Sequence, residues 1–147
     1  CHAAQAGLYS ATLETSLPVK KDPNIMAGKV DCVGCHDFTK KHSVAAQAEK
    51  CTQCHDKGYR DMVAMWQEQV GGAQKAAKAA LEKGEAALAS AKKARRDTPA
   101  ASDLLAGARK DYDLVVKAKG LHNPDLAEAI LTESKKAAER ALALVTK

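Results

Sequence analysis

The sequence predicts a mainly α-helical protein in two parts, residues 1–58 with little regular structure and residues 59–147 with long helices. Two observations support this division. In the second part, small and apolar residues recur at alternating steps of four and three, the spacing of one helix face. The first part has no sustained period and is interrupted by Pro18, Pro23 and Gly28. We therefore expect an irregular first region, then a long antiparallel helical hairpin and a C-terminal helix.

Only short elements are expected in the first part. Residues 3–17 have a weak helical pattern that Pro18 would end. Residues 18–29 contain two prolines, an asparagine and a glycine, which is typical of a loop.

The first long helix is predicted over residues 59–96. Its stripe consists of Trp66, Val70, Ala73, Ala77, Ala80, Gly84, Ala87, Ala91 and Ala94. A stripe of small residues permits close helix approach but buries little area per residue. Gly71-Gly72 is a point where this helix could bend. Asp97-Thr98-Pro99 ends the pattern, with Asp97 or Thr98 able to cap the next helix.

Two further helices are predicted over residues 100–119 and 124–145. Gly120 would follow the end of the first of them as its C′ residue. Asn123 would cap the second, and Pro124 fits its first position. The expected inward faces are Leu105, Ala108, Tyr112 and Val115 in one helix, and Leu126, Ile130, Ala137, Ala141 and Leu144 in the other.

The strongest chemical signal is a repeated Cys-x-x-Cys-His pattern, present as Cys32-Val33-Gly34-Cys35-His36 and Cys51-Thr52-Gln53-Cys54-His55. This is the attachment signature of c-type haem. Two thiols add to the two vinyl groups of one porphyrin, and the adjacent histidine becomes an axial ligand of the iron. Two complete haem c sites are therefore predicted, with short helical turns and coil around them.

Two other interpretations of these cysteines stay open. The spacing of Cys32, Cys35, Cys51 and Cys54 also fits a four-cysteine zinc site. The same residues could form two disulfides. Neither alternative gives a role to the histidine that follows each pair, and haem is the favoured interpretation.

The chain begins with Cys1-His2, which matches the end of a third Cys-x-x-Cys-His motif. A third haem, held by Cys1 with His2 as ligand, is expected on this basis, and the chain would then be the C-terminal part of a longer polypeptide. The alternative is a lipid-bearing N-terminal cysteine.

Two remaining histidines are candidate distal ligands. His42 lies between the two motifs, where it could ligate a neighbouring haem or be a solvated side chain beside lysines. His122 lies at the corner between two predicted helices, where it could ligate iron or bond a backbone carbonyl. Two bis-histidine haems need four histidines, which His36, His55, His42 and His122 supply. A third haem would need another ligand from upstream sequence or from Met26, Met62 or Met65, or it would lack one axial ligand. Spacing does not assign either distal histidine to an iron.

Composition and charge agree with haem packing. Aromatic residues make up 3% of the chain, so porphyrins would supply core that the alanine-rich sequence lacks. The formal charge of +5 is spread over helices with acidic residues among the basic ones, which does not favour nucleic acid binding. We expect no transmembrane segment, because no run of 18 apolar residues occurs. Covalent haem attachment takes place outside the cytoplasmic membrane, which predicts a bacterial or archaeal periplasmic or extracellular protein.

The order of features in residues 32–147 resembles the C-terminal half of ammonia-forming pentahaem cytochrome c nitrite reductases and related octahaem cytochromes. The shared features are two close haem motifs with a histidine between them, a helical hairpin, and Gly120-Leu121-His122-Asn123-Pro124 before a terminal helix. The resemblance implies that His122 ligates the haem on Cys32 and Cys35 and that His42 ligates a haem bound upstream. It also implies a homo-oligomer formed through the long helices.

The chain departs from that family at its catalytic features. Those enzymes carry lysine in place of the proximal histidine at the substrate haem, and this sequence has no Cys-x-x-Cys-Lys motif. No catalytic residue is therefore predicted here. Electron transfer through bis-histidine haems to other haem proteins or redox partners is the favoured function. The alternative is the electron-relay portion of a nitrite or hydroxylamine reductase whose active site lies in upstream sequence.

Overall fold

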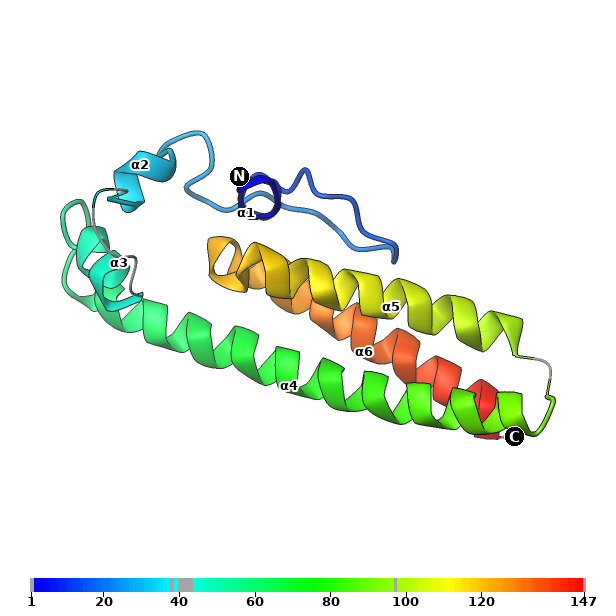
Figure 1. Ribbon diagram of the computed structural model, residues 1–147. Helices are drawn as coiled ribbons and strands as arrows, with labels where there is room; N and C mark the ends of the chain where they lie inside the picture. Colours follow the sequence, from blue (N-terminus) through cyan, green and yellow to red (C-terminus); the bar gives the residue numbers. More distant parts are fainter. Residues whose placement is uncertain (1, 38, 40–43, 97, 147) are drawn as a thin grey trace.

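The computed structural model describes residues 2–37, 39, 44–96 and 98–146, and Figure 1 shows its arrangement. Throughout this described part the regular structure is helical. The elements are α1 (Ala3–Tyr9), α2 (Cys32–Cys35), α3 (Val44–Cys51), α4 (Gly58–Lys93), α5 (Pro99–Ala118), the 3-10 helix η1 (Gly120–His122) and α6 (Pro124–Thr146). The predicted mainly α fold is confirmed.

The three long helices form a bundle. Helices α4 and α5 make the predicted antiparallel hairpin, and α6 runs back beside both of them (Figure 1). The core between them is lined by fully buried Leu81, Ile130 and Leu131. Most residues expected to face inward are buried, but Leu144 is 52% exposed because the last turn of α6 lies at the end of the bundle.

Helix α4 approaches the other two closely at Gly84. A Cβ atom placed there would lie 2.8 Å from Cδ2 of Leu105 and 3.2 Å from the carbonyl oxygen of Ala138. The glycine thus permits the close packing that the sequence stripe predicted. Gly71 and Gly72, by contrast, lie within an uninterrupted helix.

The corner between α5 and α6 forms much as predicted, with one difference. Helix α6 starts at Pro124, and the Leu126 N–H donates to Oδ1 of Asn123 at 3.3 Å, which is an N-cap bond. The residue in the left-handed conformation after α5 is Lys119, with φ of 55°, rather than Gly120. Gly120 is required instead by crowding, because a Cβ there would lie 2.6 Å from Cγ1 of Val70.

The N-terminal helix is shorter than the sequence predicted. It ends at Tyr9 rather than continuing to residue 17. Ala11 takes a positive φ of 58°, and the N–H groups of Thr12 and Leu13 both bond the carbonyl of Gly7. This local turn directs Leu13 into the core beside Leu8, and burial of both side chains outweighs the weak helical pattern.

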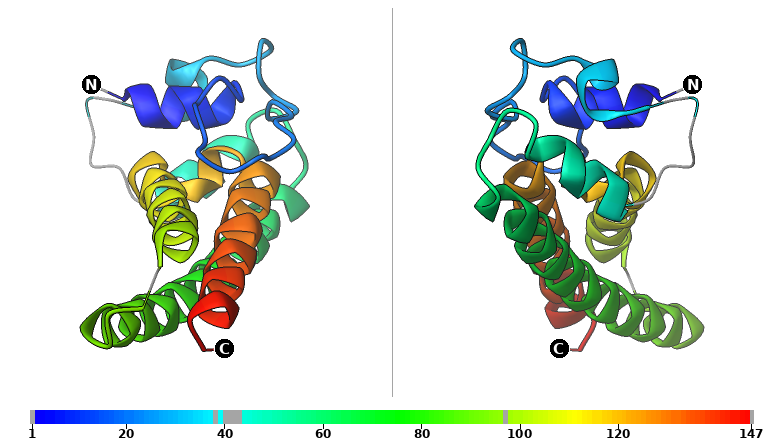
Figure 2. Two further views of the ribbon diagram at one scale, coloured as in Figure 1. Left: turned by 90° about the vertical axis from the view of Figure 1, so that its right-hand side faces the viewer. Right: turned by 90° about the vertical axis from the view of Figure 1, so that its left-hand side faces the viewer.

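Residues 10–30 then run as an irregular segment across the same end and face of the bundle as α1 (Figure 2). The segment is fixed to α5 by Asp111, which is fully buried. The two oxygens of its carboxylate accept hydrogen bonds from the N–H groups of Ser16 and Leu17, at 2.7 and 2.8 Å. Across the described residues, none of the helices is both long enough and apolar enough to cross a bilayer.

Candidate functional site

The two Cys-x-x-Cys-His motifs adopt the same backbone turn. In the first, the His36 N–H donates to the carbonyl of Cys32 at 2.8 Å; in the second, the His55 N–H donates to that of Cys51 at 2.9 Å. Asp31 caps the first turn by accepting a bond from the Gly34 N–H at 3.0 Å. Each turn therefore gathers two cysteines and a histidine on a single helical turn, which is the grouping that covalent haem attachment requires.

The four thiols of these motifs are free and accessible. Cys32, Cys35 and Cys54 are exposed, and Cys51 is half-buried. Burial raises the pKa of the Cys35 thiol, and the nearby thiols of Cys51, Cys32 and Cys54 raise it further. Helix α2 packs against α3, so the two motifs lie close to one another. No three His, Cys, Asp or Glu side chains in the described part converge on a point that could hold one metal ion.

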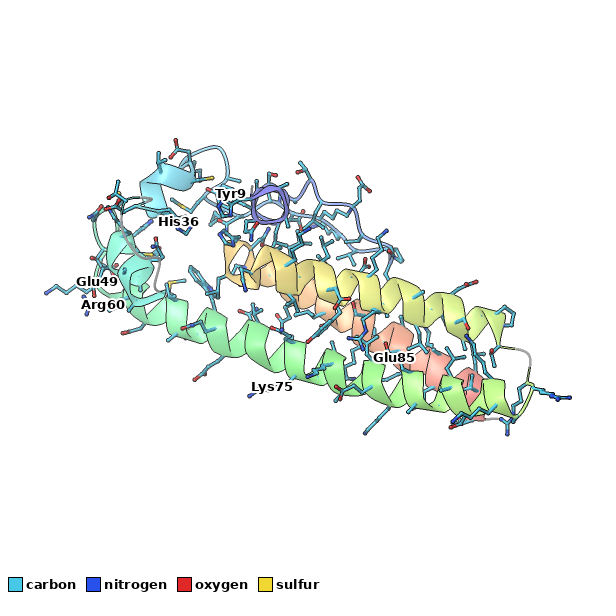
Figure 3. The ribbon with its side chains drawn as sticks, viewed as in Figure 1. Tyr9, His36, Glu49, Arg60, Lys75 and Glu85 are labelled. Atoms are coloured by element: carbon cyan, nitrogen blue, oxygen red, sulfur yellow. The ribbon has the colours of Figure 1, made fainter. Side chains whose placement is uncertain are left out.

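The structure brings His36 and His122 together, although one lies in the first motif and the other at the far corner of the bundle. Their ring centroids are 5.9 Å apart and the ring planes differ by 22°. Figure 3 shows His36 between α2 and the end of the bundle. His122, the second member of this pair, is the last residue of η1 at the turn between α5 and α6.

The tautomer of His122 follows from its hydrogen bonds. Its Nδ1 lies 3.1 Å from the carbonyl oxygen of Ala118 and 2.9 Å from that of Lys119. Two carbonyl oxygens can only accept, so Nδ1 carries the hydrogen and the neutral ring keeps a lone pair on Nε2. A backbone carbonyl on one ring nitrogen is the usual support of a histidine that ligates metal through the other.

These observations test whether the residues fit a haem iron. Two imidazoles bonded to one metal ion from opposite sides, through bonds of about 2 Å, place their ring centroids roughly 6 Å apart. The measured 5.9 Å between His36 and His122 has this magnitude. Because Nδ1 of His122 is bonded to carbonyl oxygens, its Nε2 is the nitrogen available to a metal ion. The ring separation and the free Nε2 of His122 are thus compatible with one haem held by Cys32, Cys35, His36 and His122.

The second motif has a different environment. The His55 ring stacks on Tyr59, with centroids 4.1 Å apart and planes 16° apart. Beside it, Arg60 donates to Glu49 at 2.8 Å and ties the start of α4 to α3. His55 is half-buried, so the second motif packs against the first turns of α4.

Three further site residues were predicted. Cys1 and His42 lie outside the described residues. His2 is exposed at the start of α1. The third haem and the distal role of His42 stay predictions.

Sequence reasoning missed two residues whose side chains are hydrogen-bonded to the backbone of the site, one just before the first motif and one at His122. The Tyr9 hydroxyl donates to the carbonyl of Val30 at 2.7 Å, just before the first motif. Burial raises the pKa of Tyr9, and the thiols of Cys35 and Cys32 raise it further, which agrees with this position. Asn24 donates from Nδ2 to the carbonyl of His122 at 3.1 Å. Both bonds join segments far apart in the chain, so no local pattern could have indicated them.

Comparison with known proteins adds no assignment. Neither a protein-family model, nor a curated protein, nor a solved structure matches this chain.

Proposed function

We propose that this chain holds c-type haem covalently at its two Cys-x-x-Cys-His motifs and transfers electrons. The observation that carries the proposal is the placement of His122 opposite His36, with Nδ1 of His122 bonded to backbone carbonyls. When bound, haem supplies a one-electron redox couple whose potential depends on its ligands and burial.

Each residue of the first site has a defined part in this proposal. Cys32 and Cys35 hold the porphyrin through thioether bonds, and their exposure leaves both thiols open to the attachment machinery. His36 and His122 would both bind the iron. With protein ligands on both sides, the haem would be suited to passing electrons and not to binding substrate.

The second site is defined by Cys51, Cys54 and His55. Tyr59 stacks on the His55 ring and fixes its plane, and the Arg60–Glu49 ion pair holds the motif against α4. The proposed partners are other haem proteins or redox proteins. Haem attachment of this kind also implies a periplasmic or extracellular location.

The test is production of the chain in a host that matures c-type haem, followed by pyridine haemochrome quantitation and intact mass. Two covalent haems at the described motifs are expected. His122→Ala should convert one of them from a low-spin form to a form whose ferrous iron binds carbon monoxide. Leu121→Ala is the matched control, because it removes a neighbouring η1 side chain and leaves the imidazole. A folded, colourless protein with stoichiometric zinc would overturn the proposal.

A further inference from the structure

The segment between α1 and α2 leads directly into the first motif and is hydrogen-bonded to the corner at His122. One end of the segment joins the first motif directly, through Val30 and Asp31. Its middle is hydrogen-bonded to the corner that contains His122. Residues 24–30 thus connect the corner at His122 to the first motif.

Asn24 is the residue that touches the His122 side. Its Nδ2 donates to the carbonyl of His122 at 3.1 Å, and its Oδ1 accepts from the Met26 N–H at 2.9 Å. Its backbone N–H donates to the carbonyl of Tyr9 at 2.9 Å. One half-buried side chain therefore fixes the backbone of the His122 corner and the start of the 24–30 turn together.

Tyr9 closes the other end of the same turn. Its carbonyl holds the N–H of Asn24, and its hydroxyl donates to the carbonyl of Val30 at 2.7 Å. Residues 24 and 30 are thereby both attached to one residue of α1. Asp31, the residue after Val30, caps the first motif, so the turn is joined directly to the helical turn that carries Cys32.

Asn123, the residue after His122, also bonds the N-terminal part of the chain. Asn123 is 4% exposed, and its Nδ2 donates to the carbonyl oxygens of Leu8 and Asp22 at 3.3 and 2.9 Å. Because Oδ1 of Asn123 caps α6, this side chain connects the N-terminal segment to the first turn of that helix. The corner and the segment are joined at two adjacent residues, His122 and Asn123.

We propose that Tyr9 and Asn24 are positioning residues that hold His36 opposite His122, so that His122 is the second axial ligand of the haem on Cys32 and Cys35. This inference rests on the proposed function. Both side chains are hydrogen-bonded to backbone carbonyl oxygens. Asn24 bonds the carbonyl of His122. Tyr9 bonds the carbonyl of Val30, the residue before Asp31.

The expected effect follows from the strength of one hydrogen bond. Losing it should shift the equilibrium between bound and dissociated His122 by roughly threefold to tenfold. Carbon monoxide competes with His122 for ferrous iron, so its apparent affinity for the first haem should rise by the same factor. The fraction of high-spin haem should rise with it, while haem content per chain should not change.

The experiment compares two variants of the holoprotein with wild type. Asn24→Asp keeps the acceptor for Met26 and replaces the donor with a carboxylate facing the carbonyl of His122. Tyr9→Phe removes only the hydroxyl, so it gives a folded comparison if Asn24→Asp does not fold. Thr15→Val is the matched control, since it removes a side chain to backbone bond (to Leu17, 2.9 Å) in the same segment away from the corner.

Increased carbon monoxide affinity in Tyr9→Phe, and in Asn24→Asp where that variant folds, with two haems retained and Thr15→Val unchanged, supports the inference. Affinity and spin state equal to wild type in a folded Tyr9→Phe would overturn it. Failure of wild type to hold haem is a separate result, visible before any variant is made, and it would overturn the proposed function itself.

Discussion

The bundle of α4, α5 and α6 and the region that precedes it, residues 2–57, are stabilised in different ways. The bundle buries a continuous apolar core around Leu81, Ile130 and Leu131. The motif turn α2 buries none of its residues, and Val33 within it is 64% exposed. The bundle therefore has enough apolar contact to fix its own shape, whereas the first Cys-x-x-Cys-His motif is held mainly by hydrogen bonds.

This difference indicates that the two regions have different roles in forming the candidate site. The bundle supplies a rigid corner at His122, and α1 with the following segment places the first motif over that corner (Figures 2 and 3). Under the proposed function, haem would cover the exposed side chains of the motif and link it to the bundle through His122. The comparison can be tested by variants that act on one region and leave the other unchanged.

The largest effect is expected from Cys32→Ser with Cys35→Ser. Removing both thioether bonds of the first motif should reduce the covalent haem at the two described motifs from two to one, because neither serine can add to a vinyl group. Intact mass and pyridine haemochrome measure this change. The helicity of the bundle should be retained, since none of its core residues contributes to the motif. Retention of both haems in the double variant would contradict the assignment.

A middle-sized effect is expected inside the bundle at Gly84. Gly84→Ala should lower the free energy of unfolding by about 1–3 kcal/mol, because the new methyl group would meet Leu105 and the backbone of Ala138. Urea denaturation followed by circular dichroism measures it.

The matched control in the same helix is Gly72, where an added Cβ meets no atom within 4 Å. Gly72→Ala should raise the free energy of unfolding by about 0.5–1 kcal/mol through helix propensity. Equal changes at Gly84 and Gly72 would show that close packing at Gly84 does not limit the bundle.

Periodicity was sufficient to predict the bundle. The helix predicted over residues 59–96 is observed as Gly58–Lys93, and the corner at Asn123-Pro124 caps α6 as expected. The ends of two helices differ from the prediction because of local hydrogen bonds and backbone conformation. Thr98 precedes α5 without making a side-chain capping bond, and the left-handed residue after that helix is a lysine. In α1, two hydrogen bonds to Gly7 and the burial of Leu13 end the helix earlier than the pattern indicates.

The candidate site could be predicted only in part. Both motifs were evident from the spacing of Cys32, Cys35 and His36 and of their second copy, because the signature is local. The pairing of His36 with His122 was implied by resemblance and not by spacing, and the structure places these rings 5.9 Å apart. Tyr9 and Asn24 were not foreseen, because their bonds to Val30 and His122 depend on how the segment folds back over the bundle.

The smallest effect is expected at an ion pair that joins α4 to α5. Arg109 donates to both carboxylate oxygens of Glu85, at 2.9 and 2.8 Å, and lies over the Tyr112 ring. The hydrogen bonds to Glu85 raise the pKa of Arg109, so the guanidinium stays charged. The two side chains are 32% and 42% exposed, so solvent screens the pair, and Arg109→Gln should cost only about 0.5 kcal/mol. The cost, measured by urea denaturation, should shrink at high salt. A cost comparable with that of Gly84→Ala would mean that polar contacts, and not apolar packing, hold the hairpin together.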